Sequence, residues 1–345
     1  MSSIGIVGAG AAAAAATFVL DTTLPDADIT VLEKSGGLCG RAATRRHGDL
    51  VYDYGANYVK SDDERVVELL TETLDDEGLV DAVEPIYTFD ESGTVSPGRE
   101  ADEHKWSYRS GLTQIAKRLF GRTDATVHRR TRVETIRRDG EAWRLTDTDG
   151  GSWGPFGCLV LNPPAPQTAA LLEAAEWNSP HREQLREAVA EVPYRSVWTA
   201  VLHYPFEIDR PYYGLVNTDK EHAVGWISRE ECKPGHVPDG ESLLVVQASG
   251  EWSTAHYDDD PADNVATLAD HAADIVGDER LEAPDWSDHQ GWRYALPEAG
   301  ARHGPLSSAE AERLYCLGDW VTGEGRVHAA LRNGLDVGER IAYNI

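Results

Sequence analysis

The stretch Ile4-Gly5-Ile6-Val7-Gly8-Ala9-Gly10-Ala11-Ala12-Ala13 decides the fold at the start of the chain. Residues 4–7 predict a short buried strand, residues 8–10 a tight turn, and residues 11–20 an alanine-rich helix. Residues 28–32 (Asp-Ile-Thr-Val-Leu) predict a second buried strand. A strand, a helix and a second strand in this order form a βαβ unit, which predicts a parallel sheet.

The turn carries a GxGxxA motif formed by Gly8, Gly10 and Ala13. Gly8 permits the tight turn, Gly10 lets a pyrophosphate approach the backbone, and Ala13 lets helix and strand pack closely. The helix that opens at Ala11 offers free N–H groups to phosphates. Glu33, followed by Lys34, ends the second strand, where a carboxylate accepts hydrogen bonds from ribose hydroxyls. We therefore expect an ADP moiety here; the alternative is a plain structural turn.

A second glycine-rich loop follows at once, over residues 36–46 (Gly-Gly-Leu-Cys-Gly-Arg-Ala-Ala-Thr-Arg-Arg). Such a loop is unexpected in a plain NAD dehydrogenase, and it indicates a larger cofactor that continues across the sheet. Arg41 has the planar guanidinium that neutralises phosphate charge. The alternative is a flexible loop with solvated arginines.

This loop resembles the GGR-x-x-T-R-R loop of renalase-like FAD oxidoreductases in the amine oxidase superfamily, with Gly40, Arg41 and Thr44 at matching positions. Residues 52–58 (Tyr-Asp-Tyr-Gly-Ala-Asn-Tyr), 289–295, 318–320 and 325–330 are similar to further elements of that family, in the same order. Residues 61–103 show little likeness. Cys39 departs from the pattern, because the family has a second glycine before the arginine; we expect it to be a buried bystander.

The resemblance implies roles for several further residues. Gly318 and Asp319 would lie at the ribityl chain and pyrophosphate, although Asp319 also suits a helix N-cap. Arg326 and Val327 would open a helix aimed at the pyrimidine edge of the flavin, where a helix N-terminus stabilises negative charge. Val127 would contact the adenine through its backbone. No Cys or His lies in a recognised attachment motif, so we expect noncovalent FAD.

Cofactor-type motifs lie at both ends of the chain, and predicted antiparallel strands (197–202, 223–227 and 242–248) lie between them. This order predicts an α/β fold. We expect a Rossmann-type, glutathione-reductase-like FAD-binding domain with an inserted α+β substrate domain that contains an antiparallel sheet. The FAD-binding domain would comprise residues 1–60, 105–163 and 286–345, and the substrate domain residues 61–104 and 164–285.

Aromatic residues are the candidates for the substrate side of the flavin. Trp292 and Tyr294 are two residues apart, so in a strand both point to one face. Trp226 and Tyr58 are further candidates. Buried aromatics are often plain core, and that alternative stays open for each of the four. His289 is expected to be a surface residue.

Renalase-like enzymes oxidise misreduced isomers of NAD(P)H to NAD(P)⁺ with oxygen as acceptor, and by resemblance this is the predicted activity. An amine oxidase or desaturase-like flavoprotein is the alternative within enzymes; an amine oxidase would favour a lysine near the flavin, for which Lys233 and Lys105 are the plausible residues. A second alternative is a flavin-binding redox sensor without turnover. The substrate is in either enzyme a small molecule, a dihydronicotinamide nucleotide or an amine.

Composition excludes several other classes of protein. The chain of 345 residues has a formal net charge of −27, which repels nucleic acid and anionic lipid. The four cysteines are widely spaced, with no CxxC pair, so we expect no metal site and a reduced cytoplasmic environment. No apolar stretch reaches the roughly 18 residues needed to span a membrane.

The acidity also predicts a salt-rich environment. Lysine occurs only at positions 34, 60, 105, 117, 220 and 233, and abundant carboxylates with scarce lysine resemble the proteins of salt-accumulating halophiles such as halophilic archaea. The alternative is an ordinary acidic protein. In either case the acidity bears on solubility and not on chemistry.

The protein should need molar salt to stay folded. Lowering the salt from 1 M to 0.01 M lengthens the Debye screening distance from about 3 Å to about 30 Å, so carboxylate repulsion should then unfold the chain. The measurement is the melting temperature across that range. A melting temperature independent of salt would contradict the halophilic interpretation.

Overall fold

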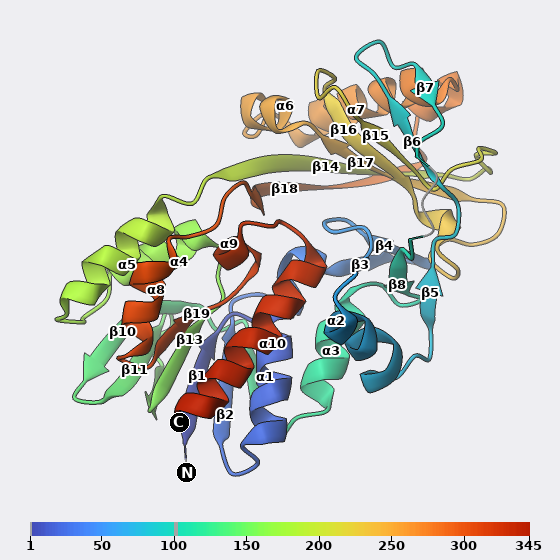
Figure 1. Cartoon of the computed structure of the whole chain (residues 1–345). Helices are drawn as coiled ribbons and strands as arrows, with labels where there is room; N and C mark the ends of the chain where they lie inside the picture. Colours follow the sequence, from blue (N-terminus) through green and yellow to red (C-terminus); the bar gives the residue numbers. More distant parts are fainter. Residues whose placement is uncertain (1, 100–102) are drawn as a thin grey trace.

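The computed structural model describes residues 2–99 and 103–345, and the element labels are those of Figure 1. A five-stranded parallel sheet forms one half of the molecule. Its strand order is β19-β13-β1-β2-β9, where the strands are β19 (Leu314–Cys316), β13 (Cys158–Leu161), β1 (Ser3–Val7), β2 (Asp28–Glu33) and β9 (Thr126–Arg129). The predicted βαβ unit is thus the centre of this sheet.

Both faces of the parallel sheet are covered (Figure 1). One face packs against the helices α1 (Ala11–Thr23), α3 (Thr113–Gly121) and α10 (Val327–Asn344). The other packs against a three-stranded antiparallel sheet of β10 (Val133–Asp139), β11 (Ala142–Asp147) and β12 (Ser152–Phe156), and against the helices α4 (Ala165–Glu173), α5 (Pro180–Ala190) and α8 (His303–Glu310). Because both faces are buried, the strands β13 and β19 are buried at every position rather than at alternating ones.

A seven-stranded sheet forms the other half of the molecule (Figure 1). Its order is β18 (Trp286–Pro297), β14 (Tyr194–Tyr204), β17 (Ser242–Ala248), β16 (Val224–Arg229), β15 (Gly214–Asn217), β6 (Ile86–Phe89) and β7 (Val95–Ser96). Neighbouring strands are antiparallel except β15 and β6. The helix α7 (Pro261–Val276) covers its outer face, and α6 (Gly250–Ala255) packs beside β14. The expected antiparallel sheet between the cofactor motifs is therefore present.

Several segments lie elsewhere than the expected domain boundaries imply. The strand β18 pairs with β14 over most of its length and so belongs to the seven-stranded sheet, although it falls in the range 286–345 expected for the FAD-binding domain. Three further segments were expected in the substrate domain. They are α4, α5, and α2 (Glu64–Glu68) with its π-helical continuation (Leu69–Thr73). Their apolar side chains pack into the cores beneath the parallel sheet. Helix amphipathicity shows that a face is buried but not against which sheet.

Short elements join the two halves. They are the hairpin of β3 (Thr44–His47) and β4 (Leu50–Asp53), the pair β5 (Leu79–Asp81) and β8 (Trp106–Tyr108), and the short helix α9 (Asp319–Thr322). No helix within residues 2–99 and 103–345 is long and apolar enough to cross a membrane.

Local sequence signals explain the sharp ends of α7. Asp260 accepts a hydrogen bond from the N–H of Ala262, and Pro261 occupies the first helical position. Gly277 ends the helix in the left-handed conformation, with φ = 71°. These signals set the bounds of the helix at Pro261 and Val276.

The helices α1 and α10 approach each other unusually closely, because glycine and alanine line their contact. A Cβ atom on Gly334 would overlap the carbonyl oxygen of Ala12, and one on Gly338 would lie 2.9 Å from the Cβ of Val19 and 3.1 Å from the carbonyl oxygen of Ala16. The contacts advance by four residues on both helices together, so the helices run in the same direction. Their N-termini therefore lie at the same edge of the parallel sheet, the edge that faces the seven-stranded sheet (Figure 1).

Replacing Gly334 by alanine should separate these helices and lower the melting temperature. Overpacking of this kind costs about 1–3 kcal/mol. The matched control is Gly304→Ala in α8, where nothing lies within 4 Å of the added atom and the helix gains propensity. Thermal unfolding of both variants tests the contact; equal melting temperatures would show that α10 tolerates displacement.

Candidate functional site

The glycine turn between β1 and α1 lies at the carboxyl edge of the parallel sheet. Gly8 has φ = 93°, which favours glycine, and its N–H donates to Leu32 O over 2.8 Å. Gly10 opens α1, and no side chain caps the N-terminus of this helix. Ala11 and Ala13 are buried in the first turn of α1. The backbone here is bare of side chains where a pyrophosphate was expected.

Glu33 ends β2 beside this turn and is 7 % exposed. One carboxylate oxygen accepts from the N–H of Ala9 and the other from the N–H of Ser35, each over 2.7 Å. These two bonds hold the carboxylate between the two loops that were expected to surround the cofactor. Each oxygen retains lone pairs for ribose hydroxyls.

Asn162, which directly follows β13, completes the turn and was not predicted as a site residue. Its Oδ1 accepts from the N–H of Gly10 over 3.1 Å, and its Nδ2 donates to Leu317 O over 3.2 Å. A Cβ atom on Gly10 would lie 2.6 Å from this Oδ1. The signal was available in the sequence, since Asn162 ends a buried strand of a parallel sheet, where ligand-binding residues gather.

The second glycine-rich loop packs directly on the first. The N–H of Cys39 donates to Ala9 O over 2.9 Å. Gly40 has φ = 56°, and a Cβ atom added to it would lie 3.7 Å from the Cα of Gly10. Cys39 is 2 % exposed, and burial raises the pKa of its thiol to about 12. A thiol in that environment stays protonated, which fits a buried bystander.

Arg41 and Asp319, both predicted at the cofactor, form a bidentate ion pair. The distances are 2.6 Å from Nη2 to Oδ1 and 2.9 Å from Nη1 to Oδ2, and Nη1 also donates to Ala295 O over 2.7 Å. Burial disfavours the guanidinium charge, but Asp319 outweighs it and the pKa of Arg41 rises. The ion pair ties the second glycine loop to α9 and β18, and a contact of Arg41 with a cofactor phosphate stays a prediction.

The N-terminus of α10 lies at the same edge. Arg326 is its exposed N-cap residue without a side-chain cap, and Val327 is its first helical residue. The first turns of α1 and α10 both lack an acidic residue. Two helices of 13 and 18 residues therefore direct uncapped, positive N-termini to one edge, which suits the pyrophosphate and the reduced flavin ring of FAD.

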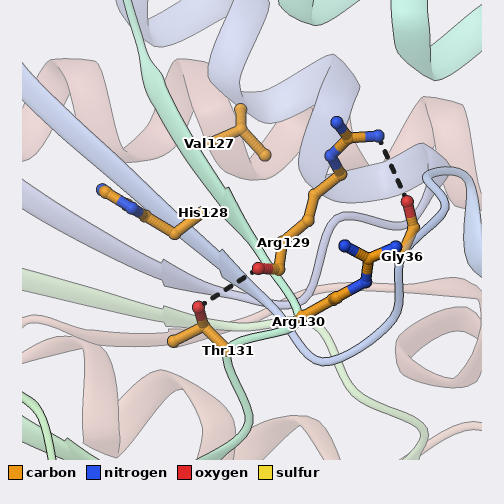
Figure 2. A pocket seen from close by; sticks show the side chains of 6 residues that line it. All are labelled: Gly36, Val127, His128, Arg129, Arg130 and Thr131. Carbon is orange, nitrogen blue, oxygen red and sulfur yellow. Dashed lines mark hydrogen bonds between the residues drawn. The ribbon is translucent and has the colours of Figure 1, made fainter.

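A cavity of about 360 Å³ lies at the end of β9 (Figure 2), where Arg129 pairs with Glu33 of β2. It is lined by Gly36, Val127, His128, Arg129, Arg130 and Thr131. Val127 was predicted at the adenine, and Arg129 donates from Nη1 to the carbonyl oxygen of Gly36 over 3.2 Å, which joins β9 to the second glycine loop. Lys34 lies nearby in sequence but donates to Gln167 Oε1, and burial lowers its pKa. The cavity thus contains Val127, the residue expected at the adenine.

The predicted substrate-side aromatics lie on two sides of the loop of residues 54–58, which we call the Tyr54–Tyr58 loop. On one side the Trp292 ring stacks on Tyr54, with 5.2 Å between centroids and 27° between planes, and its Nε1 donates to Tyr54 O. On the other side Tyr58 contacts Trp226, whose Nε1 donates to Asn57 Oδ1 over 3.2 Å. The structure thus brings Trp292, Trp226 and Tyr58 to one loop.

Tyr294 and His289 lie farther along β18. Tyr294 packs edge-on against Tyr194, with 5.7 Å between ring centroids, and makes no ring contact with Trp292 among the described residues. His289 is exposed and stacks on Trp198, so the expected surface position is confirmed. The register of β18 against β14 shifts between Trp292 and Leu296, and the two rings have different partners, so Trp292 and Tyr294 do not form one stack.

Two residues have partners that differ from the expected ones. Thr44, predicted at the cofactor, donates from Oγ1 to Asp53 Oδ1 over 2.6 Å. Lys233, considered as a flavin lysine, is fully buried, with Nζ 3.1 Å from Asp53 Oδ2 and 2.7 Å from Glu230 Oε1. Lys233 is thus an ion-pair residue inside the protein. Sequence spacing could not reveal this, because its partners come from distant segments.

A metal site is conceivable in the same cluster, because ligand atoms of Asp53, Glu230 and His236 all lie within 4.8 Å of one another. The ammonium group of Lys233 contacts both carboxylates, however. It supplies the positive charge that a metal would bring, so the arrangement is an ion cluster of side chains.

Comparison with known proteins agrees with this geometry. Residues 6–73 match an NAD(P)-binding Rossmann-like domain, and residues 99–342 match the family of flavin containing amine oxidoreductases. The chain belongs to the flavin-containing amine oxidoreductases. This flavin amine oxidoreductase is therefore an enzyme of redox chemistry with FAD as its cofactor, and the glycine turn, Glu33 and the two helix N-termini fit that cofactor.

Solved structures of the same fold cover nearly the whole chain of this flavin amine oxidoreductase. A candidate protoporphyrinogen oxidase from Exiguobacterium sp. 255-15 has 14% identity and a TM-score of 0.81, with 100% of this chain and 99% of that chain covered. Putrescine oxidase bound to putrescine has 13% identity and a TM-score of 0.74, with 99% of each chain covered. Cyclohexylamine oxidase from Brevibacterium oxydans IH-35A has 14% identity and a TM-score of 0.74, again with 99% of each chain covered. At these identities the likeness establishes the fold.

Replacing Glu33 by glutamine should weaken FAD binding by more than tenfold. The change removes the charge that strengthens the hydrogen bonds to ribose, each worth about 1.5–3 kcal/mol, while side-chain size is kept. Asp28→Asn is the matched control, because Asp28 lies exposed at the other end of β2. FAD release on dilution, followed by flavin fluorescence, measures the affinity; equal retention in both variants would place the ribose site elsewhere.

Proposed function

We propose that the protein oxidises dihydronicotinamide nucleotides that are reduced at an unusual ring position. The products would be NAD(P)⁺ and, with oxygen and a proton consumed, hydrogen peroxide. The observation that carries the proposal is the inner face of the seven-stranded sheet, where aromatic rings and carboxamides meet at the Tyr54–Tyr58 loop.

The sheet register defines this inner face. Residues that pair across neighbouring strands point to the same side, and Trp226 pairs with Gln247, which pairs with Thr199. Trp292 pairs with Val197, two residues before Thr199 on β14, so it points to that side too. The opposite, outer face carries the core beneath α7. The inner face is the one that packs on β4.

Two carboxamides stand between the aromatic groups. Gln247 donates from Nε2 to Gly55 O over 2.6 Å, and Asn57 donates from Nδ2 to the same oxygen over 3.0 Å. Within the described residues Oε1 of Gln247 makes no hydrogen bond. A nicotinamide offers a flat ring to the aromatics and a carboxamide N–H to this oxygen, so its chemistry matches the groups present.

FAD, when bound, supplies the group that accepts hydride. The half-buried Trp292 would hold the substrate ring in plane and keep water from it. Gln247 would fix the rotation of that ring through its carboxamide. The inner face needs no general acid or base for this step, because hydride loss alone restores the aromaticity of the substrate.

An amine is the competing substrate, and family membership is compatible with it. Burial of Lys233 removes one of the two lysines considered for an amine oxidase. The two carboxylates of the ion cluster, Asp53 and Glu230, are already paired with Lys233. Neither is therefore free to attract an ammonium ion, which favours the neutral dihydronicotinamide ring.

Unusual dihydronicotinamide isomers should reduce the flavin far faster than ordinary NADH or aliphatic amines, and Trp292→Ala should slow this reduction at least tenfold while FAD stays bound. The matched control is Trp286→Ala. Trp286 lies on the same strand and the same side, is also half-buried, and stacks on His47. Anaerobic stopped-flow spectroscopy measures all three proteins.

Two outcomes would count against the proposal. Faster reduction by an amine than by every nicotinamide isomer would assign the protein to amine oxidation. Loss of FAD and of about 3–5 kcal/mol of stability in Trp292→Ala would show that the ring is core.

A further inference from the structure

A buried cluster of four ionisable side chains lies between the two halves of the molecule. Asp53, Glu230, Lys233 and His236 are each 0% exposed. Asp53 ends β4, whereas the other three belong to the segment that follows β16. Neither the cofactor site nor the proposed substrate face uses these side chains. The presence of charged groups in the interior therefore needs another explanation.

Hydrogen bonds satisfy Asp53 completely. Its Oδ1 accepts from Thr44 Oγ1 over 2.6 Å and from the N–H of Leu112 over 2.9 Å, and its Oδ2 accepts from Ser107 Oγ over 2.8 Å and from Lys233 Nζ over 3.1 Å. Burial alone would raise the pKa of Asp53, but Lys233, His236 and the hydrogen bonds from Thr44 and Leu112 lower it. Asp53 is thus a buried carboxylate that three segments hold in its charged form.

The other three residues balance that charge. Lys233 Nζ lies 2.7 Å from Glu230 Oε1, and His236 Nδ1 lies 2.8 Å from Glu230 Oε2. His236 Nε2 lies 2.9 Å from Tyr108 O, which can only accept, so this nitrogen carries a proton. One further proton is then needed between His236 and Glu230. With that proton the cluster is neutral, which a site without solvent requires.

The cluster also holds the backbone at the end of β4. The N–H of Asp53 donates to Glu230 Oε2 over 3.2 Å, and the N–H of Val51 donates to His236 O over 2.8 Å. The next residue along the chain is Tyr54, where the Tyr54–Tyr58 loop begins. Asp53 is therefore the anchored end of that loop.

The Tyr54–Tyr58 loop connects the cofactor side to the substrate face. The N–H of Ala56 donates to Arg41 O over 2.9 Å, which joins the loop to the second glycine loop. Ser228 Oγ donates to Asn57 Oδ1 over 2.6 Å, next to the contacts already described for Trp226, Gln247 and Trp292. A displacement of the anchored end would change the distance between these groups and the flavin.

We propose that Lys233 and Asp53 are positioning residues, which hold the Tyr54–Tyr58 loop so that the substrate-facing groups keep their place over the flavin. They touch neither cofactor nor substrate in this role. The role of the substrate-facing groups on the loop rests on the proposed function. The anchoring of the loop rests only on the contacts described above.

The test compares Lys233→Met, which keeps side-chain length and removes the charge, with a matched buried pair that does not reach the loop. Arg229 and Glu231 form that pair, with 2.9 Å between Nε and Oε1 and side chains 9% and 13% exposed. Their other partners are Arg210 O, Tyr212 O and the N–H of Leu243. Glu231→Gln therefore reports on the general cost of disturbing a buried ion pair in the same segment.

Hydrogen exchange of the FAD-loaded proteins measures the anchoring directly. Lys233→Met should speed exchange in the peptide that contains residues 54–58 at least tenfold, and Glu231→Gln should leave that peptide as in the wild type. Anaerobic flavin reduction, with whichever nicotinamide isomer or amine reduces the wild type fastest, should show a limiting rate at least tenfold lower in Lys233→Met. The substrate concentration for half-maximal rate should change by less than threefold.

A second variant guards against a folding defect. Asp53→Asn combined with Lys233→Met removes one charge of each sign and restores neutrality, so the double variant should recover FAD content and melting temperature relative to Lys233→Met alone. Its loop should still exchange fast and its reduction should still be slow, since the ion pair is absent.

Unchanged exchange at residues 54–58 in both Lys233 variants would overturn the anchoring. Fast exchange with a wild-type reduction rate, or an equal loss of rate in Glu231→Gln, would overturn the positioning role. If only amines reduce the wild type, the proposed substrate is refuted. Hydrogen exchange at residues 54–58 in the two variants would then still decide whether Lys233 anchors the loop.

Discussion

Close backbone approach at the carboxyl edge of the parallel sheet is the constraint on which the rest of the structure depends. The two glycine loops meet at Gly10 and Gly40, and Asn162 takes the space that a side chain on Gly10 would need. Backbone N–H groups are exposed in this way without side chains in front of them. The N-termini of two helices thus direct their positive dipole ends to the place where the anionic cofactor is expected.

The same constraint explains how α10 comes to the site from the far end of the chain. Small residues on α1 and α10 bring the two helices into contact, and the contact makes them parallel. The helix that begins at Val327 must then present its N-terminus beside that of α1. The chain has a formal net charge of −27, and the two helix N-termini provide positive potential at the carboxyl edge of the parallel sheet.

Charge inside the molecule follows a different rule from charge on the surface. The Arg41–Asp319 pair is partly buried and the cluster around Lys233 is fully buried, and in both the charges are balanced. Each joins the half that holds the cofactor to a segment that belongs with the seven-stranded sheet: Arg41 reaches β18 through Ala295, and Asp53 reaches the segment after β16. Burial of such pairs contributes little net stability compared with apolar packing, but their directional bonds fix the relative position of the two halves.

The sequence by itself determined the local elements and the cofactor class. The βαβ opening, the GxGxxA turn, Glu33 at the end of its strand and the bounds of α7 all follow from spacings shorter than about 30 residues, which local sterics and periodicity control. Family resemblance added FAD and the order of the later motifs. Only the tertiary structure decided that β18 joins the seven-stranded sheet, that Asn162 completes the glycine turn, and that Arg41 pairs with Asp319. It also decided that Lys233 lies in a buried ion cluster. The contacts of Asn162 with Gly10, of Arg41 with Asp319 and of Lys233 with Asp53 each join residues more than 100 positions apart, and β18 pairs with a strand that is likewise distant in the sequence. No local pattern encodes which distant partner fills a buried space.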